Sequence, residues 1–331
     1  MSQPTLHLPS LVVGDRVQAD FLVVERSDRT KANGDPYVVL TLSNGSGTLE
    51  TAPLWTEKLG WADGAARGAI VQAIGDVGIY ARAGNPKRQL TLTAPLRVLP
   101  SDGVDFAQFL PSVGDCTRFW DWIDKQREEM KSDALRRVVD LFFADDAFRV
   151  RFERTPGSPK GHHAKLGGLL VHVYEVVAIG KNIARTMRAN ADLVVAGALL
   201  HDIGKVETYD VAPTGFGYTS CGLLIGHVTL GALMLERAVA KLGAPVCSEG
   251  QLLELQHMIL SHHGALEFGS PVQPMTTEAE IVHWADEASA KANDMQESLA
   301  DPDAFSSNGE LSDGKPWRVG RRIWRRPHEW E

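Results

Sequence analysis

His201-Asp202-Ile203-Gly204-Lys205 is the stretch from which the rest of this sequence can be interpreted. An adjacent histidine and aspartate offer a nitrogen and a carboxylate to metal ions at one point of the chain. Further potential ligands give the order H…HD…H…HH…D: His172, His227, His262, His263 and Asp286. A single buried histidine is usually a hydrogen-bonded core residue, but several unpaired imidazoles on apolar helical stretches would be costly. A pair of bound metal ions would account for all of them together.

Length and composition predict a folded protein of about two domains. The chain has 331 residues, of which 44% are hydrophobic, an ordinary fraction for a globular protein. Its three cysteines are too few and too scattered for a disulfide framework or a cysteine-rich zinc site, as is typical of a reducing compartment. No signal peptide or membrane-spanning run is recognised. We therefore expect a cytoplasmic protein that does not use a membrane.

The formal net charge of −8 argues against a protein that binds nucleic acid by bulk charge, but not against local basic surfaces. One such surface is expected at 315–326, where arginines alternate with Trp317 and Trp324 and no acidic residue intervenes. A solvated tail and a nucleic-acid or protein interface both remain open for this segment.

Apolar and polar residues alternate through the first hundred positions, as in half-buried strands. Five strands are predicted, at 17–24, 37–42, 48–55, 69–80 and 89–98. Turn-rich segments at 33–36 and 44–47 separate the first three, and a helix is expected near 57–66. This order matches a five-stranded OB-fold β-barrel, whose strand face and loops commonly hold single-stranded nucleic acid.

Side chains suited to nucleic-acid contact occupy the expected loops and strands of this barrel. Cations lie in the first and last inter-strand loops, and two aromatic rings could stack on bases. These residues are Arg29, Lys31, Tyr37, Trp55, Arg82, Lys87 and Arg88. Ordinary barrel packing and solvated surface charge are the alternative explanations for each of them.

Helical periodicity dominates the remainder of the chain. Runs at 117–130 and 134–143 precede a proline- and glycine-rich cluster at 155–160. Longer helical patterns then follow at 172–189, 191–205, 224–242, 248–261 and 278–297. The sequence therefore predicts an all-α domain after the barrel, with a helical connector between the two.

The histidine and aspartate pattern resembles the HD-domain metallophosphohydrolases. Most of the chain resembles the YhaM-type 3′–5′ exoribonucleases, which carry an N-terminal OB-fold and a C-terminal HD domain. The resemblance rests on motifs within 21–55, 160–172, 201–205, 260–264 and 278–286. We expect an α+β multidomain protein with an OB-fold domain at 1–103, a helical connector at 104–160, an HD domain at 161–300 and a basic aromatic tail at 301–331.

The resemblance also implies a set of metal ligands. His172, His201, Asp202 and Asp286 would hold one divalent ion, and Asp202 would bridge to a second ion held by His227, His262 and His263. Two such ions can activate a hydroxide and neutralise charge on a phosphodiester, so no nucleophilic side chain is required. Nitrogen-rich ligation favours manganese, iron or another transition ion over magnesium. The family resemblance favours manganese.

Other polar residues near these motifs are expected to assist. Lys205 lies one helical turn after His201, so its ammonium could contact a phosphate oxygen in the same cavity; a surface lysine is the alternative. His162 and His163 are expected to contact the terminal nucleotide or phosphate, or else to serve the structure. Two further histidines are expected to support the ligands or to pack in the core: His257 and His283.

These inferences favour a metal-dependent 3′–5′ exoribonuclease acting on single-stranded RNA, with nucleoside 5′-monophosphates as products. Single-stranded DNA as a further substrate and a homo-oligomeric state stay open. One alternative is an HD phosphohydrolase acting on nucleotides or cyclic nucleotides, with the barrel used for assembly. Another is a nucleic-acid-binding protein with a vestigial HD site, which the complete ligand set disfavours.

Overall fold

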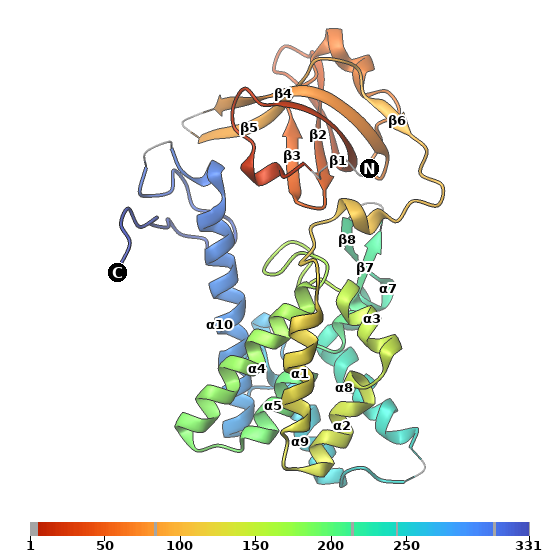
Figure 1. The fold of residues 1–331 in the computed structure, drawn as a ribbon, viewed down its shortest axis with the longest axis vertical. Coiled ribbons are helices and arrows are strands. Elements are labelled where there is room, and N and C mark those ends of the chain that lie inside the picture. The colour runs from red at the N-terminus through yellow and green to blue at the C-terminus, as the bar shows by residue number, and fades with distance from the viewer. Residues whose placement is uncertain (1–5, 83–84, 213–214, 243, 307–308, 331) are drawn as a thin grey trace. The chain divides into compact units, whose positions relative to one another are not determined.

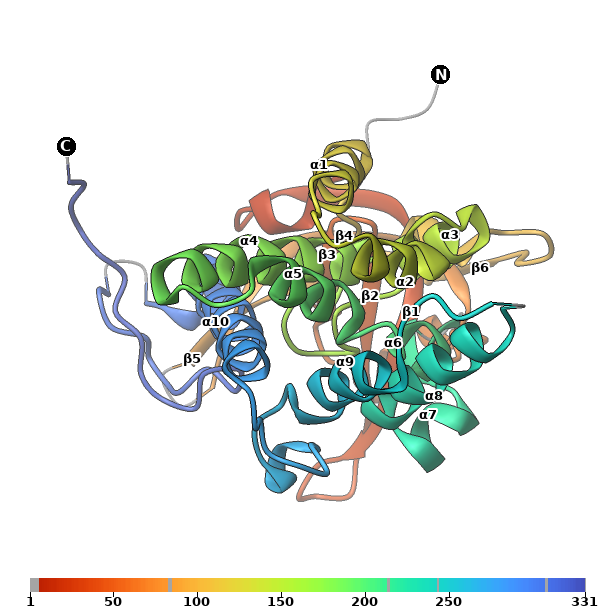
Figure 2. The ribbon, with the colours of Figure 1, turned by 90° about the horizontal axis from the view of Figure 1, so that it is seen from below.

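The computed structural model describes residues 6–82, 85–212, 215–242, 244–306 and 309–330. The chain divides into two compact units, drawn in Figures 1 and 2. The first unit comprises Met1–Ser112, Val211–Gly215 and Asp294–Glu331, and the second comprises Val113–Asp210 and Phe216–Asn293. The first unit is thus assembled from segments that are distant in the sequence.

The first unit is built on a closed barrel of five strands. They are β1 (Arg16–Thr30), β2 (Pro36–Asn44), β3 (Gly47–Thr51), β4 (Ile70–Arg82) and β5 (Asn85–Leu92). The hydrogen-bonded order is β1-β2-β3-β5-β4, and antiparallel pairing of β4 with β1 closes the ring. Strands β3 and β5 run parallel, and the other neighbouring pairs are antiparallel. The predicted five-stranded, OB-like barrel is confirmed.

Two of the predicted strands are longer than the observed ones, because prolines interrupt them. The expected fifth strand is divided into β5 and a short strand β6 (Arg97–Leu99), because Pro95 lies between them and has no N–H to donate to a ladder. The third strand ends at Thr51, just before Pro53, although Leu54 still forms a bridge with Val38. A 3₁₀-helix, η2 (Thr56–Ala62), stands where a helix was expected.

The barrel core follows from the two-residue period of its strands. Val17, Phe21 and Leu40 point inward and are fully or almost fully buried. At Gly75, where β4 crosses close to β5, a Cβ atom would lie only 2.5 Å from the carbonyl oxygen of Thr91. Glycine is therefore required for the close approach that closes the barrel.

The C-terminal segment is folded within the first unit. The 3₁₀-helix η5 (Pro302–Ala304) contacts β5, and Asp303 pairs with Arg88 at 3.5 Å. Phe305 and Ile323 are each only 3% exposed, and an isolated bridge joins Leu311 to Trp324. A fully solvated tail is therefore excluded for the described part of this segment. Two further short 3₁₀-helices of this unit are η1 (Leu8–Ser10) and η3 (Phe106–Phe109).

The second unit is helical. Its helices are α1 (Thr117–Glu128), α2 (Asp133–Phe143), α3 (Asp146–Arg154), α4 (Gly168–Met187), α5 (Ala191–Leu200), α6 (Lys205–Thr208), α7 (Ser220–Ile225), α8 (His227–Ala240), α9 (Glu249–Ser261), η4 (Leu266–Phe268) and α10 (Thr277–Ala300), the last of which continues into the first unit. Helices α4 and α5 lie side by side in both views (Figures 1 and 2). Phe143 and Phe152 of the preceding helices share one buried core with Val173 and Leu199.

Two predicted helices are interrupted next to candidate metal ligands. The helix expected over 191–205 ends at Leu200, so His201 and Asp202 lie in the turns that follow it. A Cβ on Gly204 would lie 2.0 Å from the His227 carbonyl oxygen, so only glycine permits this approach. The helix expected over 224–242 is broken at Gly226, whose φ of +79° is poorly tolerated by other residues. His227 therefore begins α8.

A short hairpin, β7 (Tyr209–Ala212) and β8 (Gly215–Tyr218), interrupts the predicted all-α domain. The aromatic residues that flank the sequence Pro-Thr-Gly were a signal for it. Among the described residues, no helix is long and apolar enough to cross a membrane.

Candidate metal centre

The candidate ligands come from five separate elements of the second unit. His172 lies in α4, His201 and Asp202 follow α5, His227 opens α8, His262 and His263 follow α9, and Asp286 lies in α10. Their ligand atoms form two groups, each with all atoms within 4.8 Å of one another: His172 with His201 and Asp286, and His227 with His262 and His263. The fold thus brings together all the ligands expected from the sequence.

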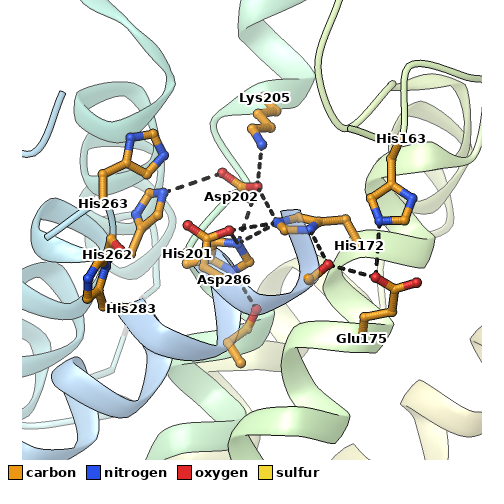
Figure 3. A network of polar contacts seen from close by, with 12 residues as sticks. His163, His172, Glu175, His201, Asp202, Lys205, His262, His263, His283 and Asp286 are labelled. Carbon is orange, nitrogen blue, oxygen red and sulfur yellow. Dashed lines mark hydrogen bonds and ion pairs between the residues drawn. The ribbon is translucent and has the colours of Figure 1, made fainter. Parts of the chain in front are cut away.

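Asp202 lies between the two groups, and its two carboxylate oxygens face different ones (Figure 3). Oδ2 lies 3.2 Å from Nε2 of His201 and 3.4 Å from Nε2 of His172. Oδ1 lies 3.4 Å from Nε2 of His227 and 3.7 Å from Nε2 of His262. This is the arrangement that a carboxylate bridging two cations requires.

Three histidine rings are held in the tautomer that metal ligation needs. Nδ1 of His201 lies 2.7 Å from the Ala198 carbonyl oxygen, and Nδ1 of His262 lies 2.7 Å from that of Ile259. His263 makes the same kind of contact with Phe268 at 2.6 Å. A carbonyl only accepts, so each Nδ1 carries a proton, and in the neutral ring Nε2 presents a lone pair.

Some buried polar atoms of this cluster lack a hydrogen-bond partner among the described residues. They include Oδ1 of Asp202, on a residue that is 1% exposed, and Nε2 of His262, on a fully buried ring. An unsatisfied buried polar group costs about 1–3 kcal/mol. A cation at each group of ligands would satisfy these atoms, so the residues present fit divalent metal ions.

The electrostatics of the cluster also suit metal ions, which need ionised carboxylates and neutral imidazoles. Burial opposes ionisation of Asp202, but the charges of Lys205 and His201 outweigh it, so its pKa lies well below the usual value. Burial likewise opposes ionisation of Asp286, yet hydrogen bonding to His172 leaves its pKa lowered. Burial lowers the pKa of His227 to about 3 and also lowers that of His262. For His172, hydrogen bonds with both aspartates overcome burial and raise the pKa, so this ring would have to release a proton to ligate a metal ion.

Lys205 and His162 lie at the cluster, whereas His163 is directed elsewhere. Lys205 is buried, and its Nζ lies 2.6 Å from Oδ2 of Asp202, so it is not a solvated surface lysine (Figure 3). The ring of His162 lies 5.3 Å from that of His172, and burial lowers its pKa to about 2. His163 is buried with φ of +50°, and its Nε2 lies 3.1 Å from Oε2 of Glu175.

Two polar residues that sequence reasoning missed complete the surroundings of His172. Its Nδ1 lies 2.9 Å from Oγ of Ser289, and that hydroxyl donates to Oε2 of Glu175 at 2.7 Å. Glu175 therefore contacts both Ser289 and His163, and its contact with His163 is drawn in Figure 3. Helical spacing could have revealed both, because Glu175 lies three residues after His172 and Ser289 three residues after Asp286.

His257 and His283 support the chain around the ligands rather than facing the cluster. Nε2 of His257 accepts from the backbone N–H of Met275 at 2.9 Å. Nδ1 of His283 lies 2.8 Å from the His262 carbonyl oxygen. A Cβ on Gly264 would lie 2.5 Å from the His283 ring, so this ring and the glycine fit each other closely.

The barrel brings part of the expected nucleic-acid-binding set together. The rings of Tyr37 and Trp55 are 4.9 Å apart, and Nζ of Lys31 lies 3.8 Å from the centre of the Trp55 ring. Arg29 is the register partner of Tyr37 across β1 and β2. All four side chains are partly or fully exposed. We name Arg29, Lys31, Tyr37 and Trp55 the barrel cluster.

The predicted cations of the last barrel loop have different surroundings. Arg88 is engaged in the fold: its Nη1 donates to the carbonyl oxygens of Leu8, Pro9 and Leu11, and its Nε pairs with Asp303. It is therefore not available to a bound strand. Lys87 is exposed on β5, whereas the side chain of Arg82 lies outside the described part of the structure.

Comparison with known proteins agrees with this geometry. A model of the HD domain matches residues 169–291. The chain is 34% identical over 289 residues to the 3′-5′ exoribonuclease YhaM of Bacillus subtilis strain 168, covering 87% of this chain and 88% of that protein. It is 32% identical to the proteins of that name from Bacillus pumilus and Listeria innocua, covering 87% of this chain and 88% and 89% of theirs. This chain therefore belongs to the YhaM family of HD-domain 3′-5′ exoribonucleases.

Proposed function

We propose that this protein is a metal-dependent 3′–5′ exoribonuclease that hydrolyses single-stranded RNA to nucleoside 5′-monophosphates. The observation that carries the proposal is the position of Asp202, with one carboxylate oxygen facing each of two ligand groups. The relatives are named 3′-5′ exoribonucleases, which supports the substrate class and the direction. A cytoplasmic location, consistent with three free cysteines, is part of the proposal.

Two divalent cations would be held by the chain's own residues. His172, His201 and Asp286 would hold one, His227, His262 and His263 the other, and Asp202 would contact both. When bound, such ions supply an activated water and neutralise charge on the phosphodiester. Six histidine and carboxylate side chains around Asp202 favour manganese or iron over magnesium, and we propose manganese.

The remaining residues of the site position the RNA end. The Lys205 ammonium is fixed by Asp202 and would contact a non-bridging oxygen of the scissile phosphate. His162 is neutral at physiological pH because burial lowers its pKa to about 2, so it would contact the terminal nucleotide by hydrogen bonding rather than by charge. His163, held by Glu175, would fix the backbone beside it.

The barrel cluster would hold the single strand on which the helical unit acts. Trp55 and Tyr37 present ring faces for stacking, and Arg29 and Lys31 present charges for phosphates. Lys87 would add a phosphate contact. A ribose 2′-hydroxyl is not needed for these contacts, so single-stranded DNA would bind the same cluster.

The test follows the length of a labelled strand. Purified full-length protein is incubated with manganese and RNA labelled at its 5′ end, in parallel with the matching DNA and with a circular RNA. We expect a descending ladder from the linear RNA, no cleavage of the circle, and no products from Asp202→Asn. Immediate release of the labelled mononucleotide would reverse the direction. Efficient hydrolysis of cyclic nucleotides without RNA degradation would favour the nucleotide phosphohydrolase instead.

A further inference from the structure

We infer that the folded segment at 309–330 is a second surface for single-stranded RNA, separate from the barrel cluster. This inference rests on the proposed activity toward RNA. The surface, which we name the C-terminal surface, carries exposed indoles and exposed guanidinium groups on a backbone that is fixed by its own contacts. These side chains are Trp317, Trp324, Trp330, Arg321, Arg325 and Arg326.

The segment has enough internal contacts to hold its side chains in place. The N–H of Ser312 donates to the Ile323 carbonyl oxygen at 2.9 Å, and the N–H of Ile323 donates to Oγ of Ser312 at 3.0 Å. Ile323 and Ser312 are both buried. Nε of Arg322 donates to the Ser312 carbonyl oxygen at 2.9 Å. A stable loop of this kind displays its outward-facing residues as a defined surface.

Three tryptophans of the segment lie largely outside the core. Trp317, Trp324 and Trp330 are 69%, 49% and 77% exposed. The ring of His328 lies 6.2 Å from that of Trp324 and 5.5 Å from that of Trp330, so the His328 ring is a neighbour of both indoles. Exposed aromatic groups gathered in one place usually mark a binding surface. Rings at these spacings offer faces on which unpaired bases can stack.

The charge of the segment is opposite to that of the whole chain. Residues 315–326 contain one lysine and five arginines and no acidic residue. With Glu310, Asp313 and Glu329 included, residues 309–330 carry a formal net charge of +3, whereas the chain as a whole carries −8. Arg321 and Arg326 are exposed. The Arg325 guanidinium is held 4.5 Å from the centre of the Phe305 ring, and its Nη2 donates to the Gly309 carbonyl oxygen. Cations concentrated on one segment attract a polyanion locally.

Single-stranded RNA is the partner that uses both properties at once. Its phosphates suit the guanidinium groups, and its unpaired bases suit the indole faces. A duplex would offer the charge but hide its bases, and an anionic membrane would offer no stacking partner. The C-terminal surface also belongs to the same compact unit as the barrel. We therefore assign it contacts with a part of the strand that the barrel cluster does not hold.

The test uses full-length protein carrying Asp202→Asn to prevent turnover, and a labelled RNA of about 20 nucleotides, longer than one OB-fold site. Trp324→Ala with Trp330→Ala should weaken binding about tenfold. Arg321→Gln with Arg326→Gln should reduce the slope of log affinity against log salt by about 1.4, since each of the two phosphate contacts on a single strand contributes roughly 0.7. Arg237→Gln with Lys241→Gln, which removes the same charge from exposed positions on the second unit, is the matched control.

Several outcomes separate this inference from the proposed function. Loss of affinity and salt dependence in the C-terminal variants, with unchanged melting temperatures and an unaffected control pair, would support it. Arg321→Lys with Arg326→Lys should restore the salt slope. Equal affinities and slopes in all variants would overturn the C-terminal surface, even if wild-type protein degrades RNA. Binding of the same surface to anionic phosphatidylserine vesicles but not to RNA would also overturn it. Wild-type protein that binds this RNA but never shortens it would count against the exonuclease alone.

Discussion

The two units of this protein place their functional side chains in opposite settings. In the helical unit Asp202, His201 and His262 are almost completely buried, and each is oriented by another buried group. In the barrel, Lys31 and Trp55 lie on an accessible surface and form a simple pairwise contact. Loss of one ligand from the buried cluster should therefore abolish hydrolysis, whereas loss of one residue from the surface cluster should remove only one contribution to binding. The following predictions test this difference.

The largest effect is expected at the ligand that faces both groups. Asp202→Ala and Asp286→Ala should each reduce RNA hydrolysis by roughly a thousandfold or more, since metal ions contribute several kcal/mol to the transition state. Asp202→Ala should lose both ions, whereas Asp286→Ala should keep more of the metal bound by the histidines of the second group. Metal content per protein, measured by elemental analysis, checks this. A full metal complement with wild-type activity in Asp202→Ala would remove the assignment.

A smaller effect is expected one step away from the ligands. Ser289→Ala and Glu175→Gln leave His172 in place but remove the contacts that orient it. Manganese affinity should fall about 10–100-fold. Calorimetric titration of the metal-free protein measures this directly. Ser298→Ala is the matched control, because Ser298 is also a buried serine of α10, and its hydroxyl donates to the Asp294 carbonyl oxygen of its own helix rather than to a candidate ligand or its support. Identical affinities in the two serine variants would show that His172 needs no such support.

On the barrel the loss should be partial and confined to binding. Trp55→Ala should weaken single-stranded RNA binding by about 1–3 kcal/mol, the value of one stacked base. KM for an oligonucleotide should rise, while hydrolysis of a small phosphodiester should stay unchanged. Trp55→Phe keeps an aromatic face and should recover most of the affinity. A matching fall in kcat on the small substrate would contradict the separation of binding from chemistry.

The smallest effect is a difference between the two units in how their stability depends on pH. Burial lowers the pKa of His162 to about 2 and that of His227 to about 3, so the folded protein excludes protons that the unfolded chain binds below about pH 6.5. Stability from these groups is present above that pH and is lost as pH falls. Between pH 6.5 and 5.5 the loss is about 1 kcal/mol for each such histidine.

Hydrogen exchange of the metal-free protein locates this loss. As the pH falls, protection of amides in α4 and α8 should decrease more than protection of amides in β1 and β4. His227→Asn should reduce the decrease. An equal fall in both units would mean that the buried histidines do not set the pH response. The raised pKa of His172 acts in the opposite direction and limits the total effect.

Sequence patterns predicted well what depends on local periodicity or on the resemblance carried by the order of histidines and aspartates. Alternation predicted the strands of the barrel, and the order of histidines and aspartates predicted which side chains converge. Predictions were weaker where distant segments touch. Helix α5 ends before His201, and Gly204 in the turns that follow packs against the backbone of His227, a contact that no local pattern reports. Arg88 has a charge that suits RNA binding, but its guanidinium donates hydrogen bonds to backbone carbonyl oxygens of residues almost eighty positions away.

The discontinuous first unit has a consequence for how the protein is made. Arg88 joins the carbonyl oxygens near η1 to Asp303, so one guanidinium ties together segments translated at the beginning and near the end of the chain. Domains generally fold as they emerge during synthesis, N-terminal parts first. The barrel can close early, but η5 and the segment beyond it are added only after every metal ligand has been synthesised. During translation, the proposed metal centre is therefore synthesised before the final part of the unit proposed to hold RNA.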